Sequence, residues 1–208
     1  MYEALRKRLE QKPQPIDPMR SYAIALILEE HQGESYLVMQ KRSAYIPQPR
    51  EISFPGGGIE EGESSREAAL RESCEELLLS PEDLDYLGPM DYLMNSPRLR
   101  LLPHVFRYTK EGLIDCFNPD EVQRLLHLPI KWLLEQKPYY TEGISALELP
   151  KDFPYERIPD GKDYPFHLSN HPFYFYTFEG EHIWGLSSRI LTHFVKMLKE
   201  LEENHDSI

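Results

Sequence analysis

The sequence predicts an α+β protein or a mixed-sheet sandwich, and three observations support this prediction. Strand-like and helix-like segments follow one another without a regular β-α-β alternation. The chain is 40% hydrophobic and 28% charged, as in ordinary globular proteins rather than disordered ones. Its 208 residues are enough for one domain with a sizeable core.

The N-terminal elements are expected to be a short helix and a β-hairpin. Residues 2–11 can form a helix that the following prolines end, so residues 1–17 are assigned to an N-terminal helix and linker, and residues 18–208 to the main domain. Residues 21–28 form a near-continuous apolar run, as expected of a buried strand. The turn HQGE separates this run from a second strand at 35–40, and the two are expected to pair.

The later elements mix strands with helices. The aromatic run FYFYTF has the composition of a strand, and the further strands are expected at 52–54, 86–94, 99–108 and 173–178. Residues 129–136 look helical, and the proline- and charge-rich residues 143–172 are predicted to form a long surface excursion. An amphipathic C-terminal helix is predicted from apolar residues at helical spacing, which are Leu186, Ile190, Leu191, Phe194, Leu198 and Leu201.

Charge and composition exclude several classes of function. The net charge of −12 has the wrong sign for a protein that binds nucleic acid. The longest aliphatic run, residues 23–28, is too short to span a bilayer, and the N-terminus lacks the apolar core of a signal peptide. Cys74 and Cys116 form no C-x-x-C pair, so neither a disulfide framework nor a zinc site is indicated. We therefore expect a cytoplasmic protein that binds neither nucleic acid nor a membrane.

An acidic helix is predicted directly after three consecutive glycines, in the stretch FPGGGIEEGESSREAALRESCEELLL. Ser64 and Glu67 have the spacing of a capping box at its start. Helical periodicity predicts that one stripe faces the core, and its residues are Leu70, Cys74 and Leu77. The opposite side carries three acids within five residues, which are Glu72, Glu75 and Glu76.

Two interpretations of these three acids are open. A solvated acidic face would tolerate them, because each like-charge pair costs only about 0.2–0.5 kcal/mol in water. The alternative is a site for a divalent cation, since carboxylates at this spacing converge and hard cations take oxygen ligands. The glycine run favours the second interpretation, because it lets the backbone approach a ligand. Arg71 lies one turn from Glu67 and from Glu75, so it can hold a carboxylate in place.

This stretch resembles the Nudix box, G-x₅-E-x₇-R-E-U-x-E-E-x-G-U, where U is a bulky aliphatic residue. Six positions match it in type and spacing, and they are Gly57, Glu63, Arg71, Glu72, Glu75 and Glu76. Ser73 stands where an aliphatic residue is expected, and Leu78 replaces the last glycine. The resemblance implies a Nudix fold, which is an α/β/α sandwich with a mixed β-sheet between helices.

The resemblance also implies chemistry and site residues. It implies Mg²⁺ or Mn²⁺ held by the Gly56 carbonyl with Glu72, Glu75 and Glu76, and hydrolysis of a diphosphate bond in a nucleoside diphosphate linked to another group. In the same scheme Arg71 orients the acids, Glu63 gives structural support and Gly57 adjoins the substrate. The cations would neutralise the acids, attract the anionic substrate and activate a water.

Three further stretches resemble the coenzyme A diphosphatases within this family. IWGLSSRIL at residues 183–191 is similar to their Trp-Gly-x-Thr-Ala-Arg segment, and NPDEV places Glu121 where they carry an extra acid. Arg42 and Ser43 match an upstream signature, in which Pro47 stands at the place of a second arginine. Arg50 falls nearby and is a candidate for that arginine's role in binding phosphate, with Arg42 and Ser43. Structural roles for Arg42, Arg50, Glu121 and Trp184 stay open.

Other functions stay open as well. Alternative substrates within the family are ADP-ribose, nucleotide sugars and dinucleoside polyphosphates. A Nudix module that senses a ligand without catalysis is a second class, although such modules tend to lose box glutamates. A Nudix-fold isomerase is a third, but it would need a cysteine and an acid across the pocket. The expected partner is a small-molecule nucleotide, and a homodimer is left open.

Overall fold

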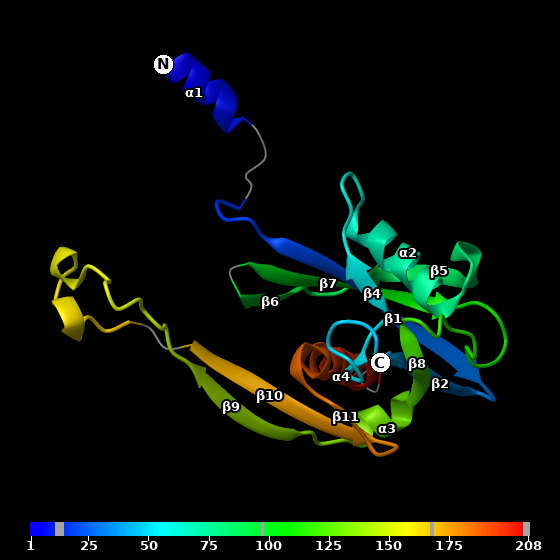
Figure 1. The fold of residues 1–208 in the computed structure, drawn as a ribbon. Helices are drawn as coiled ribbons and strands as arrows, with labels where there is room; N and C mark the ends of the chain where they lie inside the picture. The colour runs from blue at the N-terminus through cyan, green and yellow to red at the C-terminus, as the bar shows by residue number, and fades with distance from the viewer. Residues whose placement is uncertain (11–14, 97, 167–168, 206–208) are drawn as a thin grey trace. The chain divides into compact units, whose positions relative to one another are not determined.

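The computed structural model describes residues 1–10, 15–96, 98–166 and 169–205. The chain divides into two compact units, Met1–Trp132 and Leu133–Ile208 (Figure 1). The boundary expected between residues 17 and 18 falls inside the first unit and stays a prediction. Nowhere in the described ranges is there a helix whose length and apolar character would let it cross a membrane.

The first unit is built on an eight-stranded sheet with the path β3-β2-β1-β7-β5. Its strands are β1 Arg20–His31, β2 Glu34–Arg42, β3 Ile52–Ser53, β4 Gly56–Gly58, β5 Leu84–Pro89, β6 Leu93–Ser96, β7 Leu99–Tyr108 and β8 Val122–Pro129. Off this path, β4 pairs with β1, β6 with β7 and β8 with β2. The β1–β7 pair is parallel and the other pairs are antiparallel. The predicted α+β class with a mixed sheet is therefore confirmed.

Local sequence explains most of these strands. The predicted hairpin of the first two strands is confirmed as the antiparallel β1–β2 pair, in which His31 pairs with Glu34 around a two-residue turn. Gly33 supplies a positive φ of 82° in that turn, which glycine adopts without strain. The strand expected at 86–94 is divided into β5 and β6. Both pieces pair with β7, each with a register irregularity.

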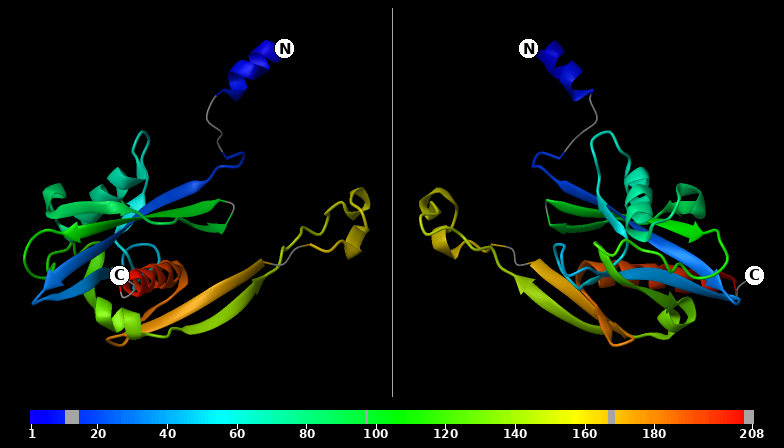
Figure 2. Two further views of the ribbon diagram at one scale, coloured as in Figure 1. Left: turned by 180° about the vertical axis from the view of Figure 1, so that it is seen from behind. Right: turned by 45° about the vertical axis from the view of Figure 1, so that its right-hand side comes forward.

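Helix α2, Ser65–Leu77, covers one face of this sheet (Figure 2). Small residues form the contact between this helix and the sheet. Ala68 and Ala69 of α2 belong to the same buried cluster as Ala23 and Ala25 of β1. The predicted core stripe of this helix was wrong in part. Its buried residues are Ala68, Ala69, Ser73, Glu76 and Leu77, whereas Leu70 and Cys74 are only partly buried. The alanines let the helix backbone approach β1, so the face that carries them is the one that is buried.

Shorter helical elements complete the first unit. Helix α1 spans Tyr2–Leu9, and all of its residues are exposed. A 3₁₀ turn, η1, spans Pro81–Asp83 after α2. Helix α3, Ile130–Glu135, crosses the division between the two units, and it confirms the helix expected at 129–136.

The second unit contains a three-stranded antiparallel sheet and the C-terminal helix. The sheet order is β11-β10-β9, with β9 Tyr139–Ser145, β10 Ser169–Phe178 and β11 Glu181–Ile183. Between β9 and β10 lie two 3₁₀ turns, η2 Tyr155–Arg157 and η3 Gly161–Asp163, within the excursion expected at 143–172. Helix α4, Gly185–His205, contacts β10 (Figure 1). Its predicted apolar face is buried at Ile190, Leu191 and Phe194.

Candidate metal centre

The start of α2 is fixed by the capping box that the sequence predicts. The Ser64 hydroxyl accepts a hydrogen bond from the Glu67 N–H at 3.3 Å, and the Glu67 carboxylate accepts one from the Ser64 N–H at 2.8 Å. The Ser64 hydrogen bonds lower the pKa of Glu67, because they favour its charged form. Two of the free N–H groups at this helix end are thereby satisfied, so the helix begins at a defined residue.

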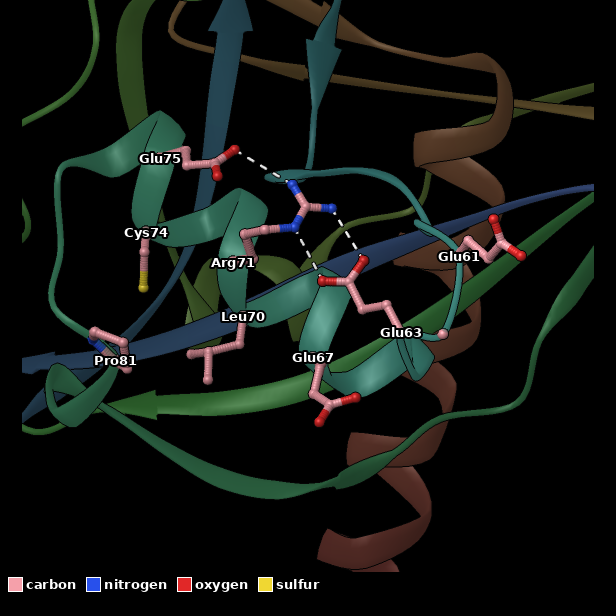
Figure 3. A pocket seen from close by; sticks show the side chains of 9 residues that line it. Glu61, Glu63, Glu67, Leu70, Arg71, Cys74, Glu75 and Pro81 are labelled. Atoms are coloured by element: carbon pink, nitrogen blue, oxygen red, sulfur yellow. Dashed lines mark hydrogen bonds and ion pairs between the residues drawn. The ribbon is translucent and has the colours of Figure 1, made fainter.

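Arg71 connects the glycine loop to the acids of α2. Its Nε and Nη2 donate to the two oxygens of Glu63 at 2.9 and 3.1 Å, and Nη2 also donates to the Gly58 carbonyl at 3.0 Å. Nη1 donates to Glu72 at 2.9 Å and to Glu75 at 3.3 Å. Figure 3 shows the guanidinium between Glu63 and Glu75. These hydrogen bonds raise the pKa of Arg71, so its charge is permanent.

Glu72 lies against Gly57, so a side chain at residue 57 would have to displace the Glu72 carboxylate. A Cβ at residue 57 would come closer than 3.0 Å to the Glu72 carboxylate. Partial burial raises the pKa of Glu72, and the nearby carboxylates of Glu75 and Glu121 raise it further, whereas Arg71 opposes the shift. Glu72 is therefore a crowded acid at the point where the glycine loop meets the helix.

Glu76 is buried, with only 3% of its surface exposed, and not on the open acidic side that periodicity predicts. Its Oε2 accepts a hydrogen bond from the Gly56 N–H at 2.8 Å, which ties the helix to β4. Burial raises the pKa of Glu76 to about 7, and the charge of Arg42 acts in the opposite direction. Gly56 itself leaves no room for a Cβ, because the backbone of Ala23 lies against it.

The acidic residue expected outside the box lies near it. The Asn118 N–H donates to the Glu76 carbonyl at 2.8 Å, and the Asn118 side chain donates to the Glu121 carboxylate at 3.3 Å. The Glu121 carbonyl accepts the Ser43 N–H at 2.8 Å. Its carboxylate is close enough to Glu72 to raise the pKa of that acid. The loop before β8 therefore brings a fourth acid to the cluster.

The candidate phosphate-binding residues lie at the end of β2 and in the segment after it. Arg42 lies near enough to Glu76 to favour its charged form, and its Nε donates to the Pro47 carbonyl at 3.1 Å. Arg50 is exposed at the end of the same turn, with φ of 64°, and its N–H donates to the Arg42 carbonyl. Ser43 is buried, and its hydroxyl accepts an N–H within that turn, so it is engaged in local structure.

The donor set fits a divalent cation in chemistry. Glu72, Glu75 and Glu76 offer oxygen ligands, and burial raises the pKa values of Glu72 and Glu76, whose charged forms a bound cation would favour. In the described ranges, no group of three or more acidic, histidine or cysteine side chains is already arranged around one metal position. The Nη1 of Arg71 donates to one oxygen of Glu72 and to one of Glu75, so the guanidinium engages both carboxylates.

An open pocket of about 620 Å³ lies on the outer side of α2 (Figure 3). Leu70, Cys74 and Pro81 form its apolar side, and Arg71 and Glu75 belong to its polar lining. Glu72 and Glu76 do not line it. The pocket therefore adjoins the acid cluster without containing it.

Trp184 and the 183–191 segment belong to the second unit. The Trp184 ring is parallel to that of Phe175, with 6.4 Å between the ring centroids, and the role of the segment in the site stays a prediction.

Sequence reasoning missed Gln40, which is fully buried on β2 beside Glu76. The available signal was a polar residue two positions after Val38, on the buried face of a strand.

Comparisons with known proteins identify the family of the chain. A family model described as the NUDIX domain matches residues 19–145. Nudix hydrolase 3 of Caenorhabditis elegans is 25% identical over 196 residues, which cover 92% of this chain and 79% of that protein. The uncharacterized Nudix hydrolase NudL of Pectobacterium atrosepticum is 24% identical over 183 residues, covering 85% of this chain and 82% of that protein. A solved Nudix hydrolase from M. smegmatis, RenU, has a TM-score of 0.47 and 17% identity, covering 56% of this chain and 74% of that one. Since the family model spans more than half of the chain, this protein belongs to the Nudix family and is a hydrolase of that family.

Proposed function

We propose that this hydrolase uses Mg²⁺ or Mn²⁺ to cleave the diphosphate bond of a nucleoside diphosphate linked to another group. One observation carries the proposal: Glu72, Glu75, Glu76 and Glu121 lie near one another beside a glycine loop, in a chain whose box matches the Nudix pattern. A solvated acidic face would not require a buried Glu76 tied to Gly56, or a Gly57 that leaves room for Glu72.

Glu72, Glu75 and Glu76 would hold the cation, with the Gly56 carbonyl as a further oxygen donor. When bound, the cation supplies Lewis acidity and positive charge for an anionic diphosphate in a protein of net charge −12. Arg71 keeps the loop and the acids in register through its bonds to Glu63 and the Gly58 carbonyl. In this scheme Arg42 and Arg50 would bind phosphate oxygens of the substrate through their guanidinium groups.

Coenzyme A or an acyl derivative is the substrate that we propose, with 3′,5′-ADP and a phosphopantetheine as products. The support is the Arg42–Ser43 pair, Glu121 beside the box, and the 183–191 segment that resembles the coenzyme A diphosphatases. ADP-ribose, nucleotide sugars and dinucleoside polyphosphates are the alternatives. A Nudix isomerase is disfavoured, because burial raises the pKa of the Cys74 thiol and so disfavours the reactive thiolate.

The test is a substrate panel. The purified protein is incubated with coenzyme A, acyl-coenzyme A, ADP-ribose, nucleotide sugars and dinucleoside polyphosphates, with Mg²⁺ or Mn²⁺, and products are identified by mass. We expect cleavage of coenzyme A to be fastest, and excess chelator to abolish it. Faster cleavage of ADP-ribose or a nucleotide sugar would overturn the substrate proposal alone. Full activity in excess chelator would overturn metal dependence.

A further inference from the structure

Two paired residues of β2 and β3 carry buried polar groups that have no hydrogen-bond partner among the described residues. Gln40 on β2 is fully buried, and neither its Nε2 nor its Oε1 has a partner within the described part of the chain. The buried hydroxyl of Ser53 on β3 is in the same situation among those residues. Each unpaired buried group costs about 1–3 kcal/mol, so such groups are rare in folded proteins and need an explanation.

The two side chains face each other beneath α2. Gln40 and Ser53 are register partners in the antiparallel β2–β3 pair, so their side chains project to the same face of the sheet. Val38, two residues before Gln40, shares the buried cluster with Leu77 of α2. Residues two apart in a strand lie on one face, and this face is therefore the one that α2 covers.

Gln40 also lies close to the acid. Its amide is near enough to Glu76 to favour the charged form of that carboxylate, although no pair of atoms between them forms a hydrogen bond of good geometry. The Gly56 N–H holds the carboxylate from the other side, at Oε2.

We propose that Gln40 and Ser53 are positioning residues that orient the Glu76 carboxylate toward the divalent cation; this inference rests on the proposed metal-dependent function. One set of bonds satisfies every unpaired atom: the Ser53 hydroxyl donates to Gln40 Oε1, and Gln40 Nε2 donates to Glu76. The carboxylate is then held by Gly56 and by Gln40. A ligand fixed in this way loses less freedom when the cation binds, which increases the affinity.

The first test replaces Gln40 by methionine, which keeps the length of the side chain and removes the amide. We expect the Mn²⁺ dissociation constant, measured by titration calorimetry, to rise about 10- to 100-fold, as for other residues that support metal ligands. The Tm without metal should fall, because the variant leaves the Ser53 hydroxyl without its proposed acceptor and Glu76 without one proposed donor. Met39→Leu is the matched control, since Met39 is equally buried on the opposite face of β2, and it should leave the Mn²⁺ affinity unchanged.

The second test asks whether Ser53 acts through Gln40. Ser53→Ala should weaken Mn²⁺ binding less than Gln40→Met does, and it should add nothing in the Gln40→Met background. If the effects of Ser53→Ala and Gln40→Met on Mn²⁺ affinity add in the double variant, Ser53 does not act through Gln40. A Gln40→Met variant that binds Mn²⁺ like the wild type overturns the inference, and a lower Tm with that result assigns Gln40 to structure alone. Absence of Mn²⁺ binding by the wild type itself would instead overturn the metal-dependent function.

Discussion

Gly57 and Glu72 are matched to each other: the carboxylate of Glu72 occupies the space that a side chain at residue 57 would need. This contact joins the glycine loop to the acidic helix, and the position of the Glu72 carboxylate depends on it. A substitution at either residue therefore acts on both the loop and the acid cluster.

Gly57→Ala should displace Glu72 and remove metal-dependent activity, because the new Cβ would lie closer than 3.0 Å to its carboxylate. We expect kcat to fall by at least about 100-fold, the order seen when one group of a metal site is lost. Gly58→Ala is the control, since among the described residues nothing lies within 4 Å of a Cβ built there. Steady-state kinetics of both variants checks this, and equal losses would contradict it.

Glu75→Gln keeps the shape of the side chain and removes its charge. If Glu75 holds the cation, kcat should fall by roughly 10²–10⁴. The Tm without metal should stay equal or rise, because Glu75 lies among other acids. Glu61→Gln, an exposed acid of the preceding loop, should leave kcat unchanged. An unchanged kcat in Glu75→Gln would identify the cluster as a solvated acidic face.

Glu76 makes the stability of the metal-free protein depend on pH. Its pKa rises from 4.5 to about 7 on folding, so the folded state binds more protons between these values. The free energy of unfolding should therefore decrease by about 3 kcal/mol as the pH rises from about 4.5 to 7, through this group alone.

Urea unfolding in chelator, at pH 5 and pH 8, measures that dependence in the wild type and in Glu76→Gln. Subtracting the pH dependence of the variant from that of the wild type removes the contribution of acids whose pKa is lowered on folding. Glu63 and Asp83 are such acids, and they change the stability in the opposite direction. The variant should show the smaller loss of stability toward pH 8. The same pH dependence in both proteins would rule out this role for Glu76.

Leu78→Gly should stabilise the protein. Leu78 ends α2 in the left-handed conformation, with φ of 50°, at the position where the Nudix box carries glycine. Glycine removes the backbone strain of the folded state, and it also gives the unfolded chain more conformational freedom, which lowers stability. The first effect should exceed the second by about 0.5–1 kcal/mol. Leu87→Gly, at a similarly exposed leucine without a positive φ, should destabilise. Urea unfolding compares the two, and a loss of stability in Leu78→Gly would contradict the expectation.

Arg50→Ala tests the coenzyme A proposal. If Arg50 binds the 3′-phosphate in place of the arginine missing at Pro47, its loss removes a charge-assisted contact of about 1.5–3 kcal/mol. KM for coenzyme A should then rise roughly 10- to 150-fold. KM for dephospho-coenzyme A, which lacks that phosphate, should change little. Equal effects on both compounds would exclude this role.

Much of the fold followed from local sequence. The β1–β2 hairpin was predictable from an apolar run and a short turn, and the start of α2 from the Ser64 and Glu67 spacing. The burial of Glu76 was not predictable by counting apolar residues around a helix. Ala68 and Ala69 pack against the alanines of β1, and this contact, between residues far apart in the chain, decides which face is buried.

As with the fold, only those features of the candidate site that depend on residues close together in the sequence were predictable. The spacing of the box glutamates was visible in the sequence, whereas the part played by Gln40 depends on the pairing of β2 with β3 and on the packing of α2 above them. The glycine run also forms a strand, β4, because β1 offers it a pairing edge. Such contacts join residues far apart in the chain, so no sequence motif of fixed spacing reveals them.

The parallel pairing of β1 with β7 has a consequence for how the protein acquires its activity. Arg20 pairs with Leu99, and the glycine loop and α2 lie in the connection between these two strands. Closing so long a connection is entropically costly and slows folding. A nascent chain on the ribosome that has not yet emerged past β7 cannot close this connection, so the sheet around β1 is completed only after most of the first unit has been synthesised.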